Sequence, residues 1–255
     1  MPQKLPALAA ILLFAAPILP AQQNQARAYR SSHEREILTE FMTLLAIPNV
    51  ASNEADISAN VIFITAMMER RGLSPRLLRG SDKSAPPLIY GEWRVPGARR
   101  TVVMYAHYDG QPTDPAKWTG SKPWQPVLRS GPLGPGSTIV DTRAAALPLN
   151  PEYRIYARSA SDDKAGVMAL LAAIDALKAG GAKPSVNVKL VFEGEEEAGS
   201  PHLDDIIRAN ATLLAADAWI ICDGPVHQSG RKQVVYGVRG DMNVDLTVYG
   251  ANRPL

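Results

Sequence analysis

The sequence predicts an α/β fold: a mixed, mostly parallel sheet with helices on both faces. Short apolar and β-branched segments alternate along the chain with longer segments whose apolar residues recur at helical spacing. Several of the short segments are apolar throughout, which is typical of strands in a sheet covered on both faces. The chain has 255 residues, of which 46% are hydrophobic and 20% charged, so it is long and apolar enough for one large domain.

The N-terminal residues have the pattern of a targeting segment. Lys4 precedes an apolar run over residues 5–19, and Ala21 offers a small residue for cleavage. This pattern predicts a secretory signal peptide over residues 1–21, with an uncleaved anchor as the alternative. We therefore expect a secreted or periplasmic protein that is not membrane-bound after cleavage. Residues 22–30 are polar and are predicted to form a linker.

Four segments are predicted to be helices. The first begins after an N-cap at Ser31-Ser32 and ends before Pro48. The other three are predicted over residues 54–71, 165–179 and 202–209.

The predicted strands are short runs rich in β-branched and apolar residues. They cover residues 88–93, 101–106, 186–192 and 218–222, with two further alternating segments over residues 234–238 and 242–249. Between them, residues 110–151 are rich in proline and glycine and are predicted to be a loop. A loop of that length in a compact domain is usually functional.

Composition excludes several classes of function. The chain carries 27 Lys+Arg and 25 Asp+Glu, a net charge of +2, and 6% aromatic residues. This balance argues against binding to nucleic acid through phosphate neutralisation or base stacking. Cys222 is the one cysteine, which excludes an internal disulfide and Cys-rich zinc motifs. With four histidines in the chain, any metal site must use carboxylates.

Acidic and imidazole residues directly follow three of the predicted strands. They are His107 and Asp109, Glu193 to Glu197 (with Gly194 between the acids), and Asp223, and a fourth cluster, Asp162 and Asp163, opens a helix. In α/β sheets, ligands bind at the carboxyl ends of the strands. Carboxylates gathered there repel one another unless a cation neutralises them. One histidine with several carboxylates and no thiolate suits zinc or manganese, and two ions are compatible with this set.

Each cluster alone has a simpler explanation. Asp162 and Asp163 are also suited to cap a helix, and Asp223 to form a turn with Gly224. The glutamate run is also compatible with a solvated loop. The conjunction at the strand ends favours a metal centre. Asp109 is then spaced to accept a hydrogen bond from the second nitrogen of a metal-bound imidazole, and adjacent glutamates can divide ligand and general-base roles.

The segments YAHYDGQP, SASDDKAG, FEGEEEAGS and ICDG, in this order and spacing, resemble a family of metal-dependent peptidases. The family includes carnosine dipeptidase, glutamate carboxypeptidase and the aminoacylases. The residues of the motifs are most similar to those of the dipeptidase branch. The resemblance covers residues 31–255. It implies a zinc-exopeptidase-like catalytic domain over residues 31–238 and the start of an α+β lid domain over residues 239–255. It also implies a homodimer formed through the lid in the full-length protein.

The resemblance also assigns roles by position. It implies two Zn²⁺ ions, with Mn²⁺ or Co²⁺ as alternatives, and hydrolysis of an amide bond in dipeptides or short peptides. Asp109 is expected to orient the imidazole, Glu196 to act as general base, and Asp162 to bridge both ions. The peptide between Asp162 and Asp163 is expected to be cis. The implied metal ligands are His107, Asp162, Glu197 and Asp223.

Two family features have no counterpart in this chain. They are a final histidine ligand of the second ion and a lid histidine that steadies the oxyanion. We therefore predict the N-terminal part of a longer metallopeptidase, with an incomplete second site and no activity by itself. The alternatives are an N-acyl amino acid deacylase of the same family and an inactive fragment that binds a metal or a partner. A magnesium phosphohydrolase also fits acid-rich strand ends, although His107 and the lack of a phosphate-binding glycine-rich loop disfavour it. Lys164 is expected to pair with a neighbouring acid.

Overall fold

The computed structural model describes residues 19–181, 183–237, 240, 242 and 244–250. The chain divides after Asp223 into two units, Met1–Asp223 and Gly224–Leu255. Most of the predicted signal peptide and part of the predicted lid segment (239–255) lie outside the described residues. The predicted division of the chain into a signal peptide, a catalytic domain and a lid therefore stays a prediction. Among the described helices, none is long and apolar enough to cross a membrane.

The first unit is built on a five-stranded sheet in the order β1-β2-β7-β3-β8. The α/β class is confirmed, but the sheet is less parallel than predicted. β3 pairs in parallel with β7 and β8, whereas β2 is antiparallel to β1 and β7. In the register of β3 and β7, His107 lies opposite Glu193, so both strands end at the same edge. The strands are β1 (Arg76–Leu78), β2 (Leu88–Trp93), β3 (Thr101–His107), β7 (Asn187–Glu193) and β8 (Ala218–Ile221).

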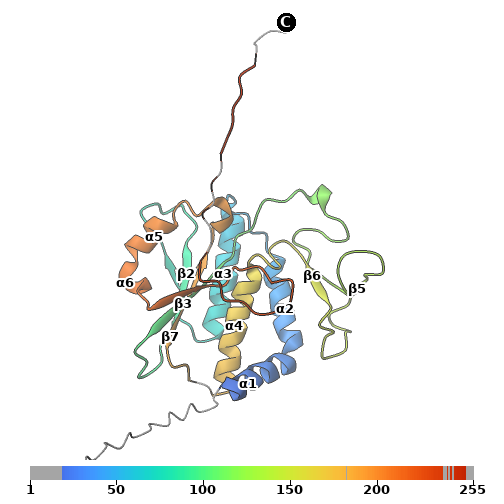
Figure 1. Ribbon diagram of the computed structural model, residues 1–255, viewed down its shortest axis with the longest axis horizontal. Coiled ribbons are helices and arrows are strands. Elements are labelled where there is room, and N and C mark those ends of the chain that lie inside the picture. Colours follow the sequence, from blue (N-terminus) through green and yellow to red (C-terminus); the bar gives the residue numbers. More distant parts are fainter. Residues whose placement is uncertain (1–18, 182, 238–239, 241, 243, 251–255) are drawn as a thin grey trace, which may run out of the picture. The chain divides into compact units, whose positions relative to one another are not determined.

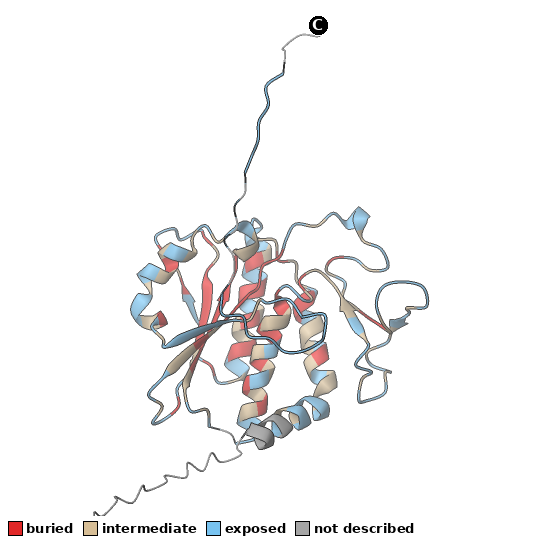
Figure 2. Ribbon diagram, viewed as in Figure 1, coloured by how far each residue is buried: buried red, intermediate tan, exposed pale blue. Residues whose placement is uncertain are grey.

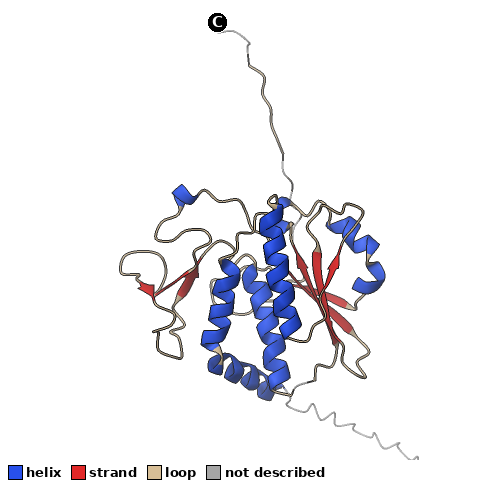
Figure 3. Ribbon diagram, turned by 180° about the vertical axis from the view of Figure 1, so that it is seen from behind, coloured by secondary structure: helices blue, strands red, loops and turns tan. Residues whose placement is uncertain are grey.

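Helices cover both faces of this sheet, as predicted (Figures 1 and 3). One face packs against α2 (Glu34–Leu45), α3 (Glu54–Arg70) and α4 (Lys164–Ala179), and the other against α5 (Leu203–Ala209) and α6 (Ala211–Leu214). Successive side chains of a strand point to opposite faces. Leu190 and Phe192 of β7 accordingly belong to the first core, and Val191 to the second. Figure 2 shows the buried strands between the two helical layers.

The segment expected to be a linker, residues 22–30, is helical. It lies within α1 (Leu19–Ser32), which packs against α4. Glutamine, alanine and arginine have good helix propensities, so the polar composition did not indicate coil. Ser31 and Ser32 therefore end α1 and do not cap the next helix; the N-cap of α2 is His33.

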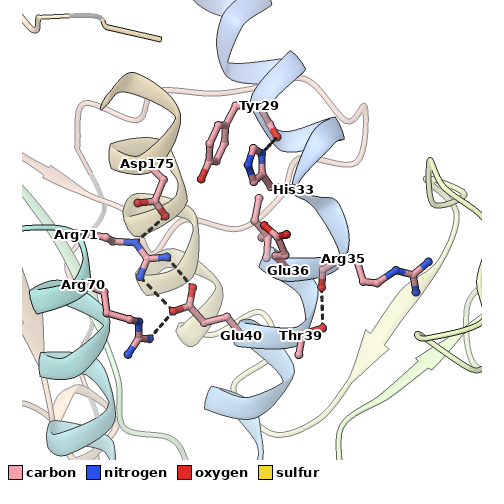
Figure 4. Close-up of a pocket in the computed structure, with 10 residues that line it drawn as sticks. Tyr29, His33, Arg35, Glu36, Thr39, Glu40, Arg70, Arg71 and Asp175 are labelled. Carbon is pink, nitrogen blue, oxygen red and sulfur yellow. Dashed lines mark hydrogen bonds and ion pairs between the residues drawn. The ribbon is translucent and has the colours of Figure 1, made fainter. Parts of the chain in front are cut away.

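A network of ion pairs joins the three helices that cover the first face (Figure 4). Arg71 directly follows α3 in the chain, and its side chain is 7% exposed. Its nitrogens lie 2.6 Å from a Glu40 oxygen of α2 and 2.8 Å from an Asp175 oxygen of α4. These charged side chains line a pocket, and the stacked rings of Tyr29 and His33 line it as well. Because every charge in the network faces an opposite one, the network fixes the helices relative to each other.

The long segment predicted as a loop contains short regular elements. It holds the 3-10 turn η1 (Pro115–Lys117) and the strands β4 (Val127–Arg129) and β5 (Ile139–Val140), and β6 (Arg154–Tyr156) follows it. The three strands form a second, antiparallel sheet in the order β5-β4-β6. The prediction of strands over residues 234–238 and 242–249 was wrong. None of their described residues is in a strand. An alternating pattern sets which side chains share a face, but a strand also needs a neighbour to accept its backbone hydrogen bonds.

Candidate metal centre

His107 lies at the carboxyl end of β3 and is fully buried. Its Nε2 atom is 2.8 Å from Asp162 Oδ1 and 3.7 Å from Asp223 Oδ2. Ligand atoms of these three residues all lie within 4.8 Å of one another. Asp223 reaches this position because β8 is parallel to β3 and ends beside it. The sheet thus brings together one imidazole and two carboxylates from three distant segments.

Asp109 holds the other side of the imidazole. Its Oδ1 is 3.2 Å from His107 Nδ1, and the carboxylate is fully buried. The same carboxylate accepts hydrogen bonds from the backbone N–H groups of Glu196 and Glu197, each at 3.1 Å. The contact between Asp109 and His107 Nδ1 favours the tautomer with a proton on Nδ1, which leaves the Nε2 lone pair free for an ion. Asp109 therefore orients the histidine and also ties it to the glutamate segment.

The two adjacent aspartates at the start of α4 have different roles. The side chain of Asp163 is the N-cap and accepts hydrogen bonds from the backbone N–H of Gly166 at 3.0 Å and of His107 at 3.2 Å. Asp162 is left to face the His107 imidazole, and its side chain is 62% exposed. The peptide between the two aspartates is cis, as the resemblance implied. The helix-cap explanation thus holds for Asp163, while Asp162 is available to a ligand.

The glutamate segment contributes one carboxylate near the group. Glu196, in the 3-10 turn η2 (Glu196–Ala198), has its Oε2 3.8 Å from His107 Nε2. Glu197 Oε2 instead accepts a hydrogen bond from Gln111 Nε2 at 2.9 Å, and it is not part of the three-residue group.

The role of Glu195 was not predicted from the sequence. Its carboxylate is buried and accepts hydrogen bonds from the backbone N–H of His202 at 2.9 Å and its Nδ1 at 3.0 Å. This contact fastens the glutamate segment to the start of α5. A partner seven residues away in the sequence carries no local signal that would have revealed it.

Lys164 was expected to pair with an acid, but among the described residues it contacts no carboxylate. Its fully buried ammonium donates to the backbone carbonyls of Leu44 at 2.9 Å and Ile47 at 2.8 Å. Burial lowers the pKa of Lys164 to about 7. Leu44 lies in the last turn of α2, where carbonyls lack partners within the helix, and Ile47 lies just after the helix; these two carbonyls take the place of the expected acid.

The electrostatics of the group are those of crowded carboxylates around one imidazole. Burial by itself lowers the pKa of His107, but hydrogen bonding to Asp109 and the charges of Asp109 and Asp223 raise it to about 10. Burial raises the pKa of Glu196 and of Asp223, and a neighbouring carboxylate raises each further. A divalent cation would relieve this repulsion. An imidazole nitrogen and two carboxylate oxygens within reach of one another are a donor set that fits one such ion.

A buried histidine that one carboxylate orients, and that is grouped with two further carboxylates, is an arrangement suited to a bound metal ion. The comparison with known families agrees. Residues 103–255 match the model of the Peptidase family M20/M25/M40, and the chain belongs to this family. The resemblance to metal-dependent peptidases predicted from the motifs is thereby confirmed.

The relatives are longer than this chain. It is 29% identical over 233 residues to the Cys-Gly metallodipeptidase of Schizosaccharomyces pombe, an alignment that covers 86% of this chain and 44% of that protein. It is 29% identical over 164 residues to the Beta-Ala-His dipeptidase of Homo sapiens, covering 64% and 28%. Among solved structures, the M20 family metallo-carboxypeptidase of Sulfolobus solfataricus aligns with a TM-score of 0.61 and 30% identity, covering 77% and 39%. The chain thus spans less than half the length of these relatives.

Proposed function

We propose that this chain carries the metal-binding catalytic part of a dipeptidase that hydrolyses the amide bond of dipeptides or short peptides. The observation that supports this most is the grouping of His107, Asp162 and Asp223, with ligand atoms within 4.8 Å of one another. The two relatives named as dipeptidases supply the substrate class. The activity belongs, in this proposal, to the longer enzyme, and we expect the chain by itself to be inactive.

Zinc is the ion that we propose. Zn²⁺ in proteins is bound by imidazole nitrogen and carboxylate oxygen, and Mn²⁺ or Co²⁺ accepts the same donors. When bound, such an ion polarises a carbonyl oxygen and makes water more acidic. We assign His107, Asp162 and Asp223 to a first ion. We assign Asp162 and Glu197 to a second, whose site we propose is incomplete in this chain.

The side chains around the ion have separate tasks in this proposal. Asp109 fixes the ring of His107 and its tautomer. Glu196 is the general base, which takes a proton from the attacking water and returns it to the leaving amine. Burial raises the pKa of Glu196, and a raised pKa makes a carboxylate a better proton acceptor near neutral pH.

The first test is the zinc content of the full chain, beside the variants Asp162→Ala and Asp175→Ala. The second variant removes an aspartate of α4 that pairs with Arg71 away from the metal group. We expect about one tightly held zinc per chain, lost in Asp162→Ala and kept in Asp175→Ala. Two zinc ions would mean that another residue completes the second site. No zinc in the unmodified chain, or retention in Asp162→Ala, would contradict the assignment of ligands.

The second test compares hydrolysis of a dipeptide with hydrolysis of an N-acetyl amino acid by the full-length enzyme. Cleavage of the dipeptide alone supports the proposal, and preference for the acyl substrate would instead indicate the deacylase of the same family. Bound zinc with no hydrolysis of either substrate would indicate an inactive metal-binding protein.

We further propose that the protein is secreted or periplasmic, on the basis of the apolar run over residues 5–19. N-terminal sequencing of the mature protein tests this proposal, since cleavage near Ala21 is the expected result. A homodimer formed through the lid stays a prediction for the full-length enzyme, to be tested by its mass in solution.

A further inference from the structure

The connection between α2 and α3 contacts two chain segments of the metal centre, the one that carries His107 and Asp109 and the one that leads to Asp162. Asn49 in this connection is fully buried. Its Nδ2 donates to the backbone carbonyl of Tyr108 at 2.8 Å and to Ser159 Oγ at 2.9 Å. The backbone carbonyl of Asn49 accepts a hydrogen bond from the backbone N–H of Gly110 at 2.9 Å. One side chain and its backbone thus hold the segment that carries Asp109 beside the segment that leads to Asp162.

Lys164 holds the same segment from the other side. Its ammonium, with no exposed surface, binds the carbonyls of Leu44 and Ile47 at 2.9 and 2.8 Å. The Leu44 carbonyl lies in the last turn of α2, where helix carbonyls lack intrahelical donors and the helix dipole is negative, and Ile47 follows two residues after the end of the helix at Leu45. A buried ammonium is costly without such partners. The cost indicates that this position has a task that an apolar side chain would not perform.

The task follows from where Asp162 lies between these anchors. Its carboxylate is 62% exposed and contacts His107, so the surrounding side chains do little to fix it. The backbone must set its position instead. Ser159, three residues before it, is fastened to Asn49, and Lys164, two residues after it, is fastened to α2.

We propose that Lys164 and Asn49 are positioning residues of the metal centre, which hold the Asp162 turn against the end of α2 at the distance from His107 that a shared ion requires. The inference deepens the proposed function and rests on it, since it assumes that the group binds an ion. Loss of a residue that orients metal ligands typically lowers metal affinity by about 10- to 100-fold. We expect a loss of that size in Lys164→Met.

The chain offers a matched control for this variant. Lys189 is also buried, and its ammonium donates to the carbonyls of Leu213 at 2.7 Å and Ala215 at 2.6 Å, at the end of α6. It lies in β7, opposite Val103 and away from the end of the strand. Lys189→Met therefore removes equivalent bonds from the same kind of site without touching the turn of Asp162.

The experiment uses the full chain with zinc alone as the probe. Zinc affinity is measured by competition with a chromophoric chelator, and hydrogen exchange is measured on the metal-free protein. For Lys164→Met, we expect affinity to fall about 10- to 100-fold and exchange to rise over residues 158–166. For Lys189→Met, we expect unchanged affinity and faster exchange near residues 211–216. The visible spectrum of the Co²⁺-loaded chain is expected to change in Lys164→Met alone.

The inference is overturned if Lys164→Met binds zinc like the unmodified chain, or if Lys189→Met weakens binding equally. Should Lys164→Met fail to fold, Asn49→Ala provides the same test, with faster exchange expected over residues 108–110 and 158–160 and weaker zinc binding. If the unmodified chain binds no zinc, the proposed function fails, and the exchange of the metal-free protein still decides whether these two residues fix the turn. Unchanged exchange over residues 158–166 in both Lys164→Met and Asn49→Ala would refute the positioning role of the two residues.

Discussion

Replacing Asp109 by alanine tests the structure of the candidate centre most directly. The carboxylate of Asp109 is fully buried and accepts from three donors: Nδ1 of His107 and the backbone N–H groups of Glu196 and Glu197. No other residue contacts both the histidine and the glutamate segment in this way within the described part of the chain. Asp109→Ala should therefore affect stability and metal binding together.

The size of the effect follows from two opposing contributions. A hydrogen bond to a charged group contributes about 1.5–3 kcal/mol, so three of them contribute at least about 4.5 kcal/mol. Removing a buried carboxylate also removes its desolvation cost, which is several kcal/mol. We expect the free energy of unfolding of the metal-free chain to fall by about 2–3 kcal/mol. Since the His107 ring loses its orienting partner, zinc affinity should fall about 10- to 100-fold.

Urea unfolding of the metal-free chain measures the first quantity, and competition with a chelator measures the second. Asp175→Ala serves as the control, because it also removes a carboxylate with a charged partner, in the ion-pair network of Arg71. It should lower stability and leave zinc affinity unchanged. Normal zinc binding by Asp109→Ala would refute the orienting role, and an equal loss in Asp175→Ala would reduce the effect to general destabilisation.

Three further predictions follow from particular contacts. Arg71→Met should lower the free energy of unfolding by about 2–3 kcal/mol in urea, below the range for fully buried pairs because Glu40 and Asp175 are 20% and 24% exposed; an unchanged midpoint would contradict this. In the metal-free chain, the pKa of His107 is raised to about 10. The stabilisation from His107 is thus complete below pH 6.5, its unfolded pKa, and is lost as pH rises through about 10, which NMR titration of the ring checks. Zinc at 100 times its dissociation constant should stabilise the chain by about 2.7 kcal/mol; a chelator should reverse this, and Asp162→Ala should show no such gain in a thermal melt.

The parts of the fold that the sequence predicted well are those with a local signal. The apolar, β-branched runs fix β2, β3 and β7 within about a residue of their observed bounds. His107 and Asp223 could be placed at one edge because each follows such a run, whereas Asp162, at the start of a helix, was assigned to the same group by the resemblance of the motifs. Parallel neighbouring strands end at a common edge, so the order of strands did not need to be known in detail.

The parts that were missed depend on partners distant in the chain. Helix α1 is polar, and its contact with α4 could not be seen from composition. The buried partners of Lys164 are carbonyls more than a hundred residues away, whereas sequence reasoning considered only nearby acids. The alternating segment over 242–249 was predicted to be a strand from its pattern alone. Whether such a pattern becomes a strand depends on a neighbour that the pattern does not identify.

The double attachment at Asn49 has a practical consequence. The chain leaves the ion-binding residues at Gly110 and returns to them at Ser159, and Asn49 fixes both points. With its ends fixed, a turn between two strands of this excursion can be lengthened cheaply, since doubling a flexible loop costs only about 0.6 kcal/mol. The exposed turn over residues 132–136, between β4 and β5, is consequently a place to graft a fluorescent or affinity tag. Such a tag would report on the folded protein without disturbing its chemistry.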